Sequence, residues 1–321
     1  MTTSRRAFNS GIIALLYTGT SAFAQKETGK LIVGYPPGQS VDAVARVLAE
    51  RLGPVIGRTL IVENMPGLAG SVALAAVSRM PADGSVMTLS ASAAIAGNPF
   101  LYKNVRYDSL KDFEPIGLIY DAPLVLMVSS LLPVQSMQDL VAYAKTNAGM
   151  VNYSSPGNGS VSHLAMSEFI RRAGIEMTHV PYQGSAKSLT DLAAGQVQVS
   201  FDAYAAAQPF LSGGRVRAIA VSSRERTSVL PSVPTVAESG LPDFDLVPWV
   251  GLLAPAGMSK PVVDKISEAL ASIVRSQDFS QRIVALGGRP RSSTAPEFRT
   301  FVRAEVERWA AIVRSSGARL E

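Results

Sequence analysis

The chain has 321 residues, of which 30 are Lys or Arg and 25 are Asp or Glu, so its formal net charge is +5. It contains no cysteine, which excludes disulfide scaffolds, cysteine nucleophiles and cysteine-ligated metal sites. The basic residues are scattered along the sequence rather than clustered, so we expect no nucleic acid as a partner.

Residues 1–24 have the pattern of a secretory signal peptide. Arg5 and Arg6 form a short basic region, residues 11–22 are an apolar stretch too short to span a bilayer, and residues 22–24 are an A-x-A cleavage signal. We expect cleavage after Ala24 and export to the periplasm; a core helix of the mature domain is the alternative. Both the Sec and the twin-arginine routes stay open, because residues 4–8 resemble a twin-arginine signal. No later segment is apolar enough to insert into a membrane.

The first part of the mature chain alternates strands with helices. Residues 31–34 predict a strand, and the helix after it has an apolar stripe that starts at Val41 and is expected to stop at Gly53-Pro54. The next expected elements are a strand at 59–63, a helix at 71–79 and a strand at 86–90. Such a βαβαβ series predicts a parallel sheet with right-handed crossovers.

The same alternation continues after residues 114–128, an apolar block that we predict to cross between two domains. The expected later strands are 150–154, 178–181, 197–201, 218–222 and 249–254, and the expected helices end near 173 or span 185–194, 260–275 and 295–314. The pattern predicts two α/β lobes with a cleft between them. Lobe 1 would comprise residues 25–120 plus about 247–321, and lobe 2 residues 121–246.

Three glycine-bearing loops join strands to helices, at residues 36–42, 66–71 and 155–160. In the first loop, two prolines stiffen the exit from the strand, Gly38 permits a positive φ, and Ser40 is a plausible N-cap. The N–H groups of a first helical turn have no intrahelical partner, so they bind anions without a basic side chain. Each loop alone fits an ordinary turn, but three of them beyond strand ends predict a carboxylate site in the cleft.

Individual side chains leave alternatives open. Asp42 either complements the helix dipole or accepts a hydrogen bond from a ligand, while Tyr182 is a better candidate for the cleft than Phe201, which we assign to the core. Ser160 and His163 could suggest an exported hydrolase, although a helix cap followed by a first-turn residue is simpler. With no Walker motif, no G-x-S-x-G and no paired histidines, we expect no metal, no cofactor and no enzymatic activity.

Taken together, the motifs resemble the Bug family, the extracytoplasmic solute receptors of tripartite tricarboxylate transporters. Their order and spacing over almost the whole mature chain carry the resemblance, which no single motif would. The matching segments are Tyr35-Pro-Pro-Gly-x-x-x-Asp42-x-x-Ala-Arg46, Val62-Glu-Asn-x-Pro-Gly-x-x-Gly70, Tyr153-Ser-Ser-Pro-Gly-Asn-Gly-Ser160-x-x-His163-Leu164, Val180-Pro-Tyr-x-Gly184, Asp191-Leu-x-x-Gly-Gln-Val197, Phe201-Asp202, Leu230-Pro-x-Val-Pro-Thr-Val-Ala-Glu-Ser-Gly240 and Trp249-x-Gly-Leu-Leu-Ala-Pro-Ala-Gly257.

The resemblance implies a two-domain periplasmic binding protein, type 2-like, with crossing strands between two α/β lobes that close on a small organic carboxylate. It implies delivery of the ligand to membrane transporter subunits, and we expect a monomer; a sensor module without its own transporter is the alternative. By motif position, the ligand contacts in lobe 1 would be Pro37, Gly38, Gln39, Asp42, Pro66, Gly67, Gly70 and Ser90, with Ala91 adjacent. Those in lobe 2 would be Ser155, Gly157, Asn158, Ser160 and Asp202. Tyr182 is added to them because of its position beside Gln183-Gly184.

The sequence departs from the family pattern in both lobe 1 loops. Gln39 stands where a second glycine is usual, so its amide either contacts the ligand or crowds the loop. Leu68-Ala69 replaces Ala-Gly, and we expect Leu68 to be solvent-exposed. Known ligands of the family include citrate, other dicarboxylates, acidic amino acids and aromatic carboxylates, and nothing in this sequence selects among them.

Overall fold

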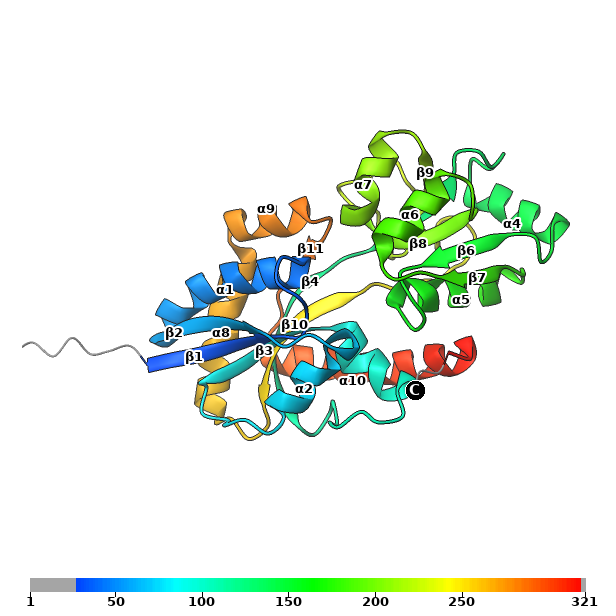
Figure 1. The fold of residues 1–321 in the computed structure, drawn as a ribbon. Helices are drawn as coiled ribbons and strands as arrows, with labels where there is room; N and C mark the ends of the chain where they lie inside the picture. The colour runs from blue at the N-terminus through cyan, green and yellow to red at the C-terminus, as the bar shows by residue number, and fades with distance from the viewer. Residues whose placement is uncertain (1–26, 319–321) are drawn as a thin grey trace, which may run out of the picture.

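The computed structural model describes residues 27–318 and shows two α/β lobes joined by extended segments (Figure 1). The predicted signal peptide, its cleavage site and the twin-arginine pattern lie outside the described residues. Within residues 27–318 no helix has the length and the apolar character needed to cross a membrane.

The sheet of the first lobe has the strand order β11-β4-β10-β3-β1-β2. Its strands are β1 (Glu27–Val33), β2 (Arg58–Asn64), β3 (Val86–Ala91), β4 (Phe113–Asp121), β10 (Trp249–Pro255) and β11 (Arg289–Pro290). β1 is parallel to both β2 and β3, as the βαβαβ pattern predicts. The late strand β10 inserts antiparallel between β3 and β4, so the sheet is mixed rather than parallel.

Helices cover both faces of this sheet. One face packs against α1 (Ser40–Ile56), α8 (Lys260–Arg275) and α9 (Gln277–Ala285), and the other against α2 (Ser71–Val77), the short helical turns η2 (Ala93–Gly97) and α3 (Asn98–Leu101), and α10 (Ala295–Ser316). The predicted stop of the first helix at Gly53-Pro54 is wrong. Pro54 removes only one N–H near the helix end, and the helix continues to Ile56, where Gly57 at φ 80° donates to the carbonyls of Gly53 and Pro54.

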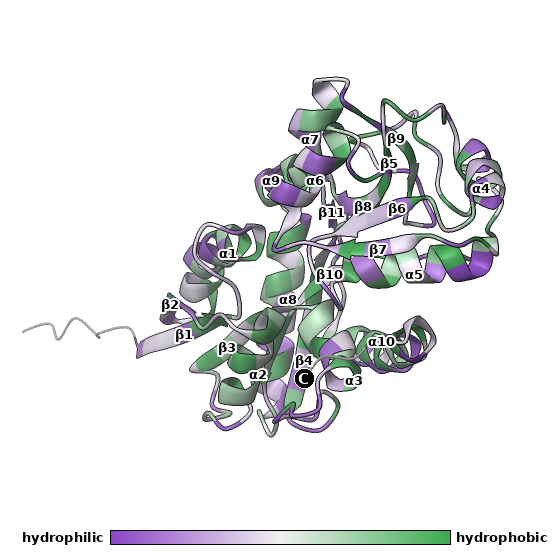
Figure 2. Ribbon diagram, turned by 45° about the vertical axis from the view of Figure 1, so that its right-hand side comes forward, coloured by the Kyte–Doolittle hydropathy of each residue, from purple (hydrophilic) through white to green (hydrophobic). Residues whose placement is uncertain are grey.

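The sheet of the second lobe has the order β7-β6-β8-β5-β9. Its strands are β5 (Leu124–Ser129), β6 (Asn152–Ser155), β7 (Thr178–Pro181), β8 (Val199–Ala203) and β9 (Val216–Val221), and its helices are α4 (Met137–Thr146), α5 (Val161–Ala173), α6 (Ser185–Ala193) and α7 (Tyr204–Ser212). Green and purple alternate along α5 and α10 in Figure 2, as expected for helices with one buried face.

The carboxyl ends of the strands in the two sheets face each other. In lobe 1, β1, β2, β3 and β4 all end at one edge, since β3 and β4 are both antiparallel to β10. In lobe 2, Leu124 pairs with Ala203, so β5 starts where β8 ends. Only Ala122 and Pro123 separate β4 from β5, and three peptide units span at most about 11 Å. The two loop-bearing edges are therefore held close together next to this crossing.

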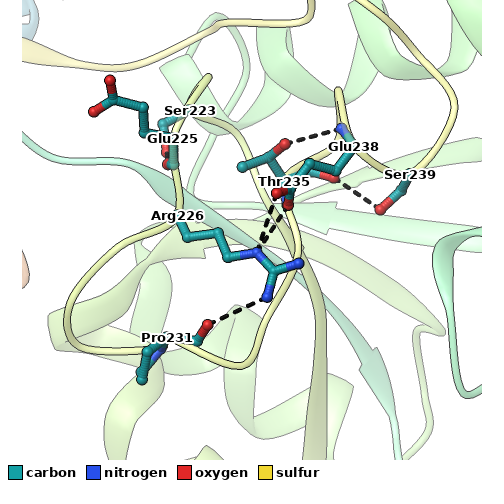
Figure 3. A network of polar contacts seen from close by, with 7 residues as sticks. All are labelled: Ser223, Glu225, Arg226, Pro231, Thr235, Glu238 and Ser239. Atoms are coloured by element: carbon teal, nitrogen blue, oxygen red, sulfur yellow. Dashed lines mark hydrogen bonds and ion pairs between the residues drawn. The ribbon is translucent and has the colours of Figure 1, made fainter.

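A second connection returns from β9 to β10 beside the first. Ala122 N–H donates to the carbonyl of Pro248 at 2.8 Å, and Leu124 N–H donates to Ser222 Oγ at 2.9 Å. Residues 222–248 contain no helix or longer strand, yet polar contacts fix the first half (Figure 3). Arg226 donates to Glu238 and to the carbonyl of Pro231, and Thr235 and Glu238 exchange hydrogen bonds in the manner of a capping box.

Both tryptophans of the chain meet one carboxylate where the returning segment enters lobe 1. Trp249, the first residue of β10, donates its indole N–H to Glu305 Oε2 at 2.7 Å, and Trp309 donates to the same atom at 3.1 Å. Arg308 pairs with Glu305 and also donates to the carbonyl of Asp245. Helix α10 is thereby tied to the segment that returns from lobe 2.

Backbone contact between Gly34 and Gly70 is the tightest junction below the first two loops. A Cβ on Gly34 would lie 2.5 Å from the Cα of Gly70, so Gly34→Ala forces the backbone apart and is expected to cost about 1–3 kcal/mol of unfolding free energy. Gly97→Ala is the control, because its Cβ would meet nothing closer than 3.8 Å and its φ is −92°. Urea denaturation measures both, and equal stabilities of the two variants would contradict the close approach.

Candidate functional site

The loop after β1 is organised by the carboxylate of Asp42, which is 2% exposed. Its Oδ2 accepts from Gly38 N–H at 2.9 Å and from Arg46 Nε at 3.0 Å, and its Oδ1 accepts from Arg46 Nη2 and from Asn64 Nδ2. Asn64 also donates to the carbonyl of Tyr35, which links the ends of β1 and β2. These contacts support a positioning role for Asp42 rather than a free acceptor for a ligand.

The same contacts determine the charge of Asp42. Burial alone would raise its pKa, but the hydrogen bonds from Arg46, Gly38 and Asn64 outweigh it and lower the pKa to about 2. The positive charge of Arg46 is balanced by its salt bridge with Asp42, so the loop presents no net positive side chain to the cleft.

The N-terminus of α1 lies one residue earlier than predicted. Gln39, not Ser40, is the N-cap, and its side chain makes no capping hydrogen bond. The N–H groups of Ser40, Val41 and Asp42 meet no acceptor within residues 27–318. Pro37, Gly38, Gln39 and Ser40 are exposed, whereas Val41 and Asp42 are buried, so the cluster reaches the surface at its Ser40 end.

The loop after β2 has an unusual backbone. Gly67, Leu68, Ala69 and Gly70 all have positive φ, with Leu68 at 45° and Ala69 at 48°. Left-handed conformations cost a non-glycine residue roughly 1–2 kcal/mol, so Leu68 and Ala69 are strained. In the family pattern the position of Ala69 is a glycine, which would carry no such strain. Leu68 is 49% exposed, which confirms the expectation for it.

Side chains from two other segments hold this strained loop. Tyr35 Oη donates to the carbonyl of Ala69 at 3.1 Å, and Asn98 Nδ2 donates to the carbonyl of Leu68 and to Ser71 Oγ. Pro66 and Gly67 are exposed, whereas Gly70 is buried against Gly34. Ser90, near the end of β3, is 3% exposed at the same edge of the sheet.

In lobe 2, the loop from Ser155 to Ser160 rests on a stack of aromatic rings. His163 and His179 are the two histidines of the chain, and their rings stack at 4.0 Å with an interplanar angle of 6°, with Tyr153 stacked on His179 at 4.8 Å. Gly159 N–H donates to His163 Nδ1 at 3.1 Å, and His179 Nε2 lies 2.8 Å from Ser155 Oγ. The loop is therefore bonded to the ring of His163 through its backbone and to the ring of His179 through the Ser155 hydroxyl.

The possible Ser160–His163 catalytic pair does not form in this geometry. Ser160 Oγ accepts the backbone N–H of His163 at 3.2 Å, which is a helix cap, and the ring of His163 is engaged by Gly159. Ser155 Oγ is likewise engaged, with the backbone of Gly157 and with His179, while Asn158 is exposed. The helix-cap interpretation of Ser160 is thus confirmed.

Two further predicted residues have partners in their own lobe. Tyr182 Oη donates to Asp191 Oδ2 at 2.9 Å, and burial together with that carboxylate raises the pKa of Tyr182 to about 12. Asp202, near the end of β8, is 2% exposed and uses only Oδ1, which accepts from Ser185 Oγ and Ala203 N–H. Phe201 is fully buried in the core, as predicted.

Sequence reasoning missed the residues that hold the loops. Asn64 is 22 residues from Asp42 in the sequence, and Asn98 is 30 residues from Leu68, so each residue reaches its partner only in the folded chain. It also missed Asp121, the last residue of β4, which accepts hydrogen bonds from both Arg289 and Arg291 beside the crossing. Asn64 alone had a local signal, because it is the last residue of β2, directly before the loop.

The loops do not line the main cavities of this arrangement. A cavity of about 390 Å³ lies between α5 and α10, with Arg172, Phe244 and Arg308 among its walls. The lobe 1 loops are instead largely exposed at the edge that faces lobe 2. The loops, rather than this cavity, form the candidate site, because both sheets direct their strand ends toward them.

The family model "Tripartite tricarboxylate transporter family receptor" matches residues 44–318. The protein BugT of Bordetella pertussis is 33% identical over 91% of this chain and 90% of its own. A UPF0065 protein from the tcbD-tcbE intergenic region of a Pseudomonas species is 31% identical over 96% of this chain and 94% of its own.

Solved structures of periplasmic binding proteins are also similar to this chain. Rpa4515 of R. palustris with adipate has 32% identity and a TM-score of 0.79, covering 92% of this chain and 99% of that one. MatC from Rhodopseudomonas palustris with bound malate has 28% identity and a TM-score of 0.74, covering 89% and 99%. The periplasmic binding protein BugD has 31% identity and a TM-score of 0.75, covering 92% and 100%.

The Asp42 contacts predict a specific loss of stability. Asp42→Asn places an amide N–H₂ against donors from Gly38, Arg46 or Asn64, so the unfolding free energy should fall by about 1–3 kcal/mol. Asp264→Asn is the control, because its pair with Lys260 is exposed and should contribute less than about 0.5 kcal/mol. Chemical denaturation that gave the same loss in both variants would rule out the positioning role.

The stacked histidines predict a pH dependence. Burial lowers the pKa of both rings, and burial plus the neighbouring His163 lowers that of His179 to about 4, whereas unfolded histidines titrate near 6.5. The folded state therefore binds fewer protons between about pH 6.5 and 4, and stability should fall as the pH falls through this range.

His179→Gln tests this expectation, since glutamine can still donate to Ser155 but has no imidazole to protonate. The loss of unfolding free energy between about pH 6.5 and 4 should shrink, by on the order of 2 kcal/mol, relative to the wild type. Lys145→Gln, an exposed change in the same lobe, should keep the wild-type slope. Parallel slopes in all three proteins would show that the stack does not titrate in this way.

Proposed function

Because this chain belongs to the tripartite tricarboxylate transporter receptor family, which includes the Bug proteins, we propose that it is an extracytoplasmic receptor for a small organic carboxylate. The observation that carries the proposal is the uncapped first turn of α1, whose three N–H groups have no acceptor among the described residues, at the sheet edge that faces lobe 2. Two similar structures contain adipate and malate, both organic acids.

Backbone recognition explains how an acid is held without a basic side chain. Each carboxylate oxygen can accept two hydrogen bonds, and amides at a helix start add the positive end of the dipole. The hydrogen bonds to the acid would come from the free N–H groups of Ser40, Val41 and Asp42. The residues predicted to line the site around them are Pro37, Gly38, Gln39, Pro66, Gly67, Gly70 and Ser90 in lobe 1, and Ser155, Gly157, Asn158, Ser160, Tyr182 and Asp202 in lobe 2. Asp42 acts behind them by holding Gly38 and Asn64 in place.

The exposure of the loops supports binding coupled to lobe closure. Both connections between the lobes are extended segments, joined by few hydrogen bonds, and such segments serve as hinges in two-lobed receptors. We expect the open form to expose the loop amides and the closed form to bury the acid between the two edges. Catalysis forms no part of this proposal.

Localisation and partners follow from the family. We propose that the mature protein acts in the periplasm as a monomer and delivers its ligand to membrane subunits of a tripartite tricarboxylate-type transporter. The description of the matching family model supports this assignment, as does the predicted signal peptide at residues 1–24.

A thermal-shift panel tests the carboxylate proposal. Organic acids at a hundredfold excess over Kd should stabilise the folded protein by about 2.7 kcal/mol, which raises its melting temperature. Panels of matched sugars and simple amines serve as negative controls. A protein that is stabilised by these compounds and by no organic acid would not be a carboxylate receptor.

The two glycines that flank α1 locate the site. Gly38 and Gly57 have φ of 85° and 80°, and a Cβ would meet nothing within 4 Å at either position, so Gly→Ala should cost each a similar amount of stability, about 1 kcal/mol. Gly38→Ala should also weaken acid binding, measured by calorimetry, because it shifts the loop before the free amides. Gly57→Ala at the far helix end should bind as the wild type does. Equal affinities in the two variants would place the site elsewhere.

A further inference from the structure

The carboxylate of Asp202 lies at the lobe 2 edge that faces lobe 1, and within residues 27–318 only one of its two oxygens has hydrogen-bond partners. Its Oδ1 accepts from Ser185 Oγ at 2.9 Å and from Ala203 N–H at 2.8 Å. Its Oδ2 is buried and has no hydrogen-bond partner among the described residues. A buried acceptor without a partner costs free energy, and more so when it is charged, so this atom calls for a donor.

The position of Asp202 shows where a donor would come from. It is the fourth residue of β8 and pairs with Val125, directly beside the crossing from lobe 1. Two residues later, the ring of Tyr204 packs on lobe 1, since a Cβ on Gly287 would lie 2.8 Å from its Cδ1. Asp202 therefore lies at the edge of the lobe 2 sheet that faces lobe 1.

The charges around Asp202 limit the kinds of ligand group that could bind its free oxygen. No salt bridge within residues 27–318 joins it to a Lys or Arg, and the nearest charged pair on α6, Lys187 with Asp191, is complete in itself. Burial raises the pKa of Asp202 to about 6, so near pH 7 the group is mostly ionised and both oxygens are acceptors. A second ligand carboxylate at this position would face a like charge, whereas an ammonium or hydroxyl group would supply the missing bond.

We infer that the ligand of this receptor is a carboxylic acid that also carries a hydrogen-bond donor, a hydroxyl or an ammonium group, and that this donor binds Oδ2 of Asp202. The inference rests on the proposed function, with the acid group held at the α1 edge and the donor at the β8 edge. It separates this receptor from one that takes a plain dicarboxylate.

Calorimetric titration of a matched set of ligands tests the inference. Butanoate, 4-hydroxybutanoate, 4-aminobutanoate and succinate share one chain length, and shorter and longer homologues cover the unknown span. At the length that fits, the hydroxy or amino acid should bind roughly 10- to 100-fold more tightly than both the unsubstituted acid and the diacid, since its bond is to a charged acceptor. The hydroxy and amino arms tell the two kinds of donor apart.

Asp202→Asn makes the test sharper. Its Oδ1 can still accept from Ser185 and Ala203, but an N–H₂ donor replaces the free oxygen, so the preference should reverse in favour of the diacid. A structural role alone would weaken all ligands without reversing their order. Ser185→Ala removes a bond to Oδ1 only and should keep the wild-type order, and urea midpoints verify that both variants fold.

The possible outcomes have distinct meanings. A donor preference that Asp202→Asn reverses supports the inference. Acids that bind with the same ranking in the wild type and in Asp202→Asn overturn it while leaving the carboxylate receptor in place, as would an ordered water on Oδ2 in a ligand-bound crystal structure. If no acid binds at any length, both the inference and the proposed function fail.

Discussion

The fold of the site depends on one covalent constraint, the three peptide units from Asp121 to Leu124. They join the end of β4 to the start of β5, which lies beside the end of β8, so the carboxyl ends of two separate sheets are held within about 11 Å at this point. Asp121 is fixed there by Arg289 and Arg291, and the returning segment is bonded alongside through Ala122 and Pro248. A longer or looser crossing would let the loops of the two lobes face in unrelated directions.

Charges near the first loop are satisfied within the protein, and this shapes how an acid can be bound. Arg46 is paired with Asp42, so the groups left for a ligand are backbone N–H groups. Such groups are fixed by the backbone and need little reorganisation, but they depend on a loop held in place by Asn64, Tyr35 and Asn98. Affinity in this arrangement should depend on loop geometry and closure more than on ionic strength.

The sequence could predict what is local and periodic. The stripe that starts at Val41 and the short strands around it give β1, α1, β2 and β3, and the apolar block at 114–128 does contain the crossing. Four helices, α3, α4, α7 and α9, were not predicted, although the capping box of Ser136 and Asp139 was a local signal for α4. Partners distant in sequence escaped altogether: nothing near Asp42 indicates Asn64, and nothing near His163 indicates that His179 will stack on it. The free oxygen of Asp202 is likewise a property of the packed structure.

The shared contact of Trp249 and Trp309 with Glu305 has a practical consequence. These are the two tryptophans of the chain, and one of them begins the strand by which the chain re-enters lobe 1. A rotation of the lobes that pulls on this segment is expected to change the polarity around the indole ring of Trp249. The wavelength of the intrinsic tryptophan fluorescence should therefore follow opening and closing of the lobes in solution without an attached dye.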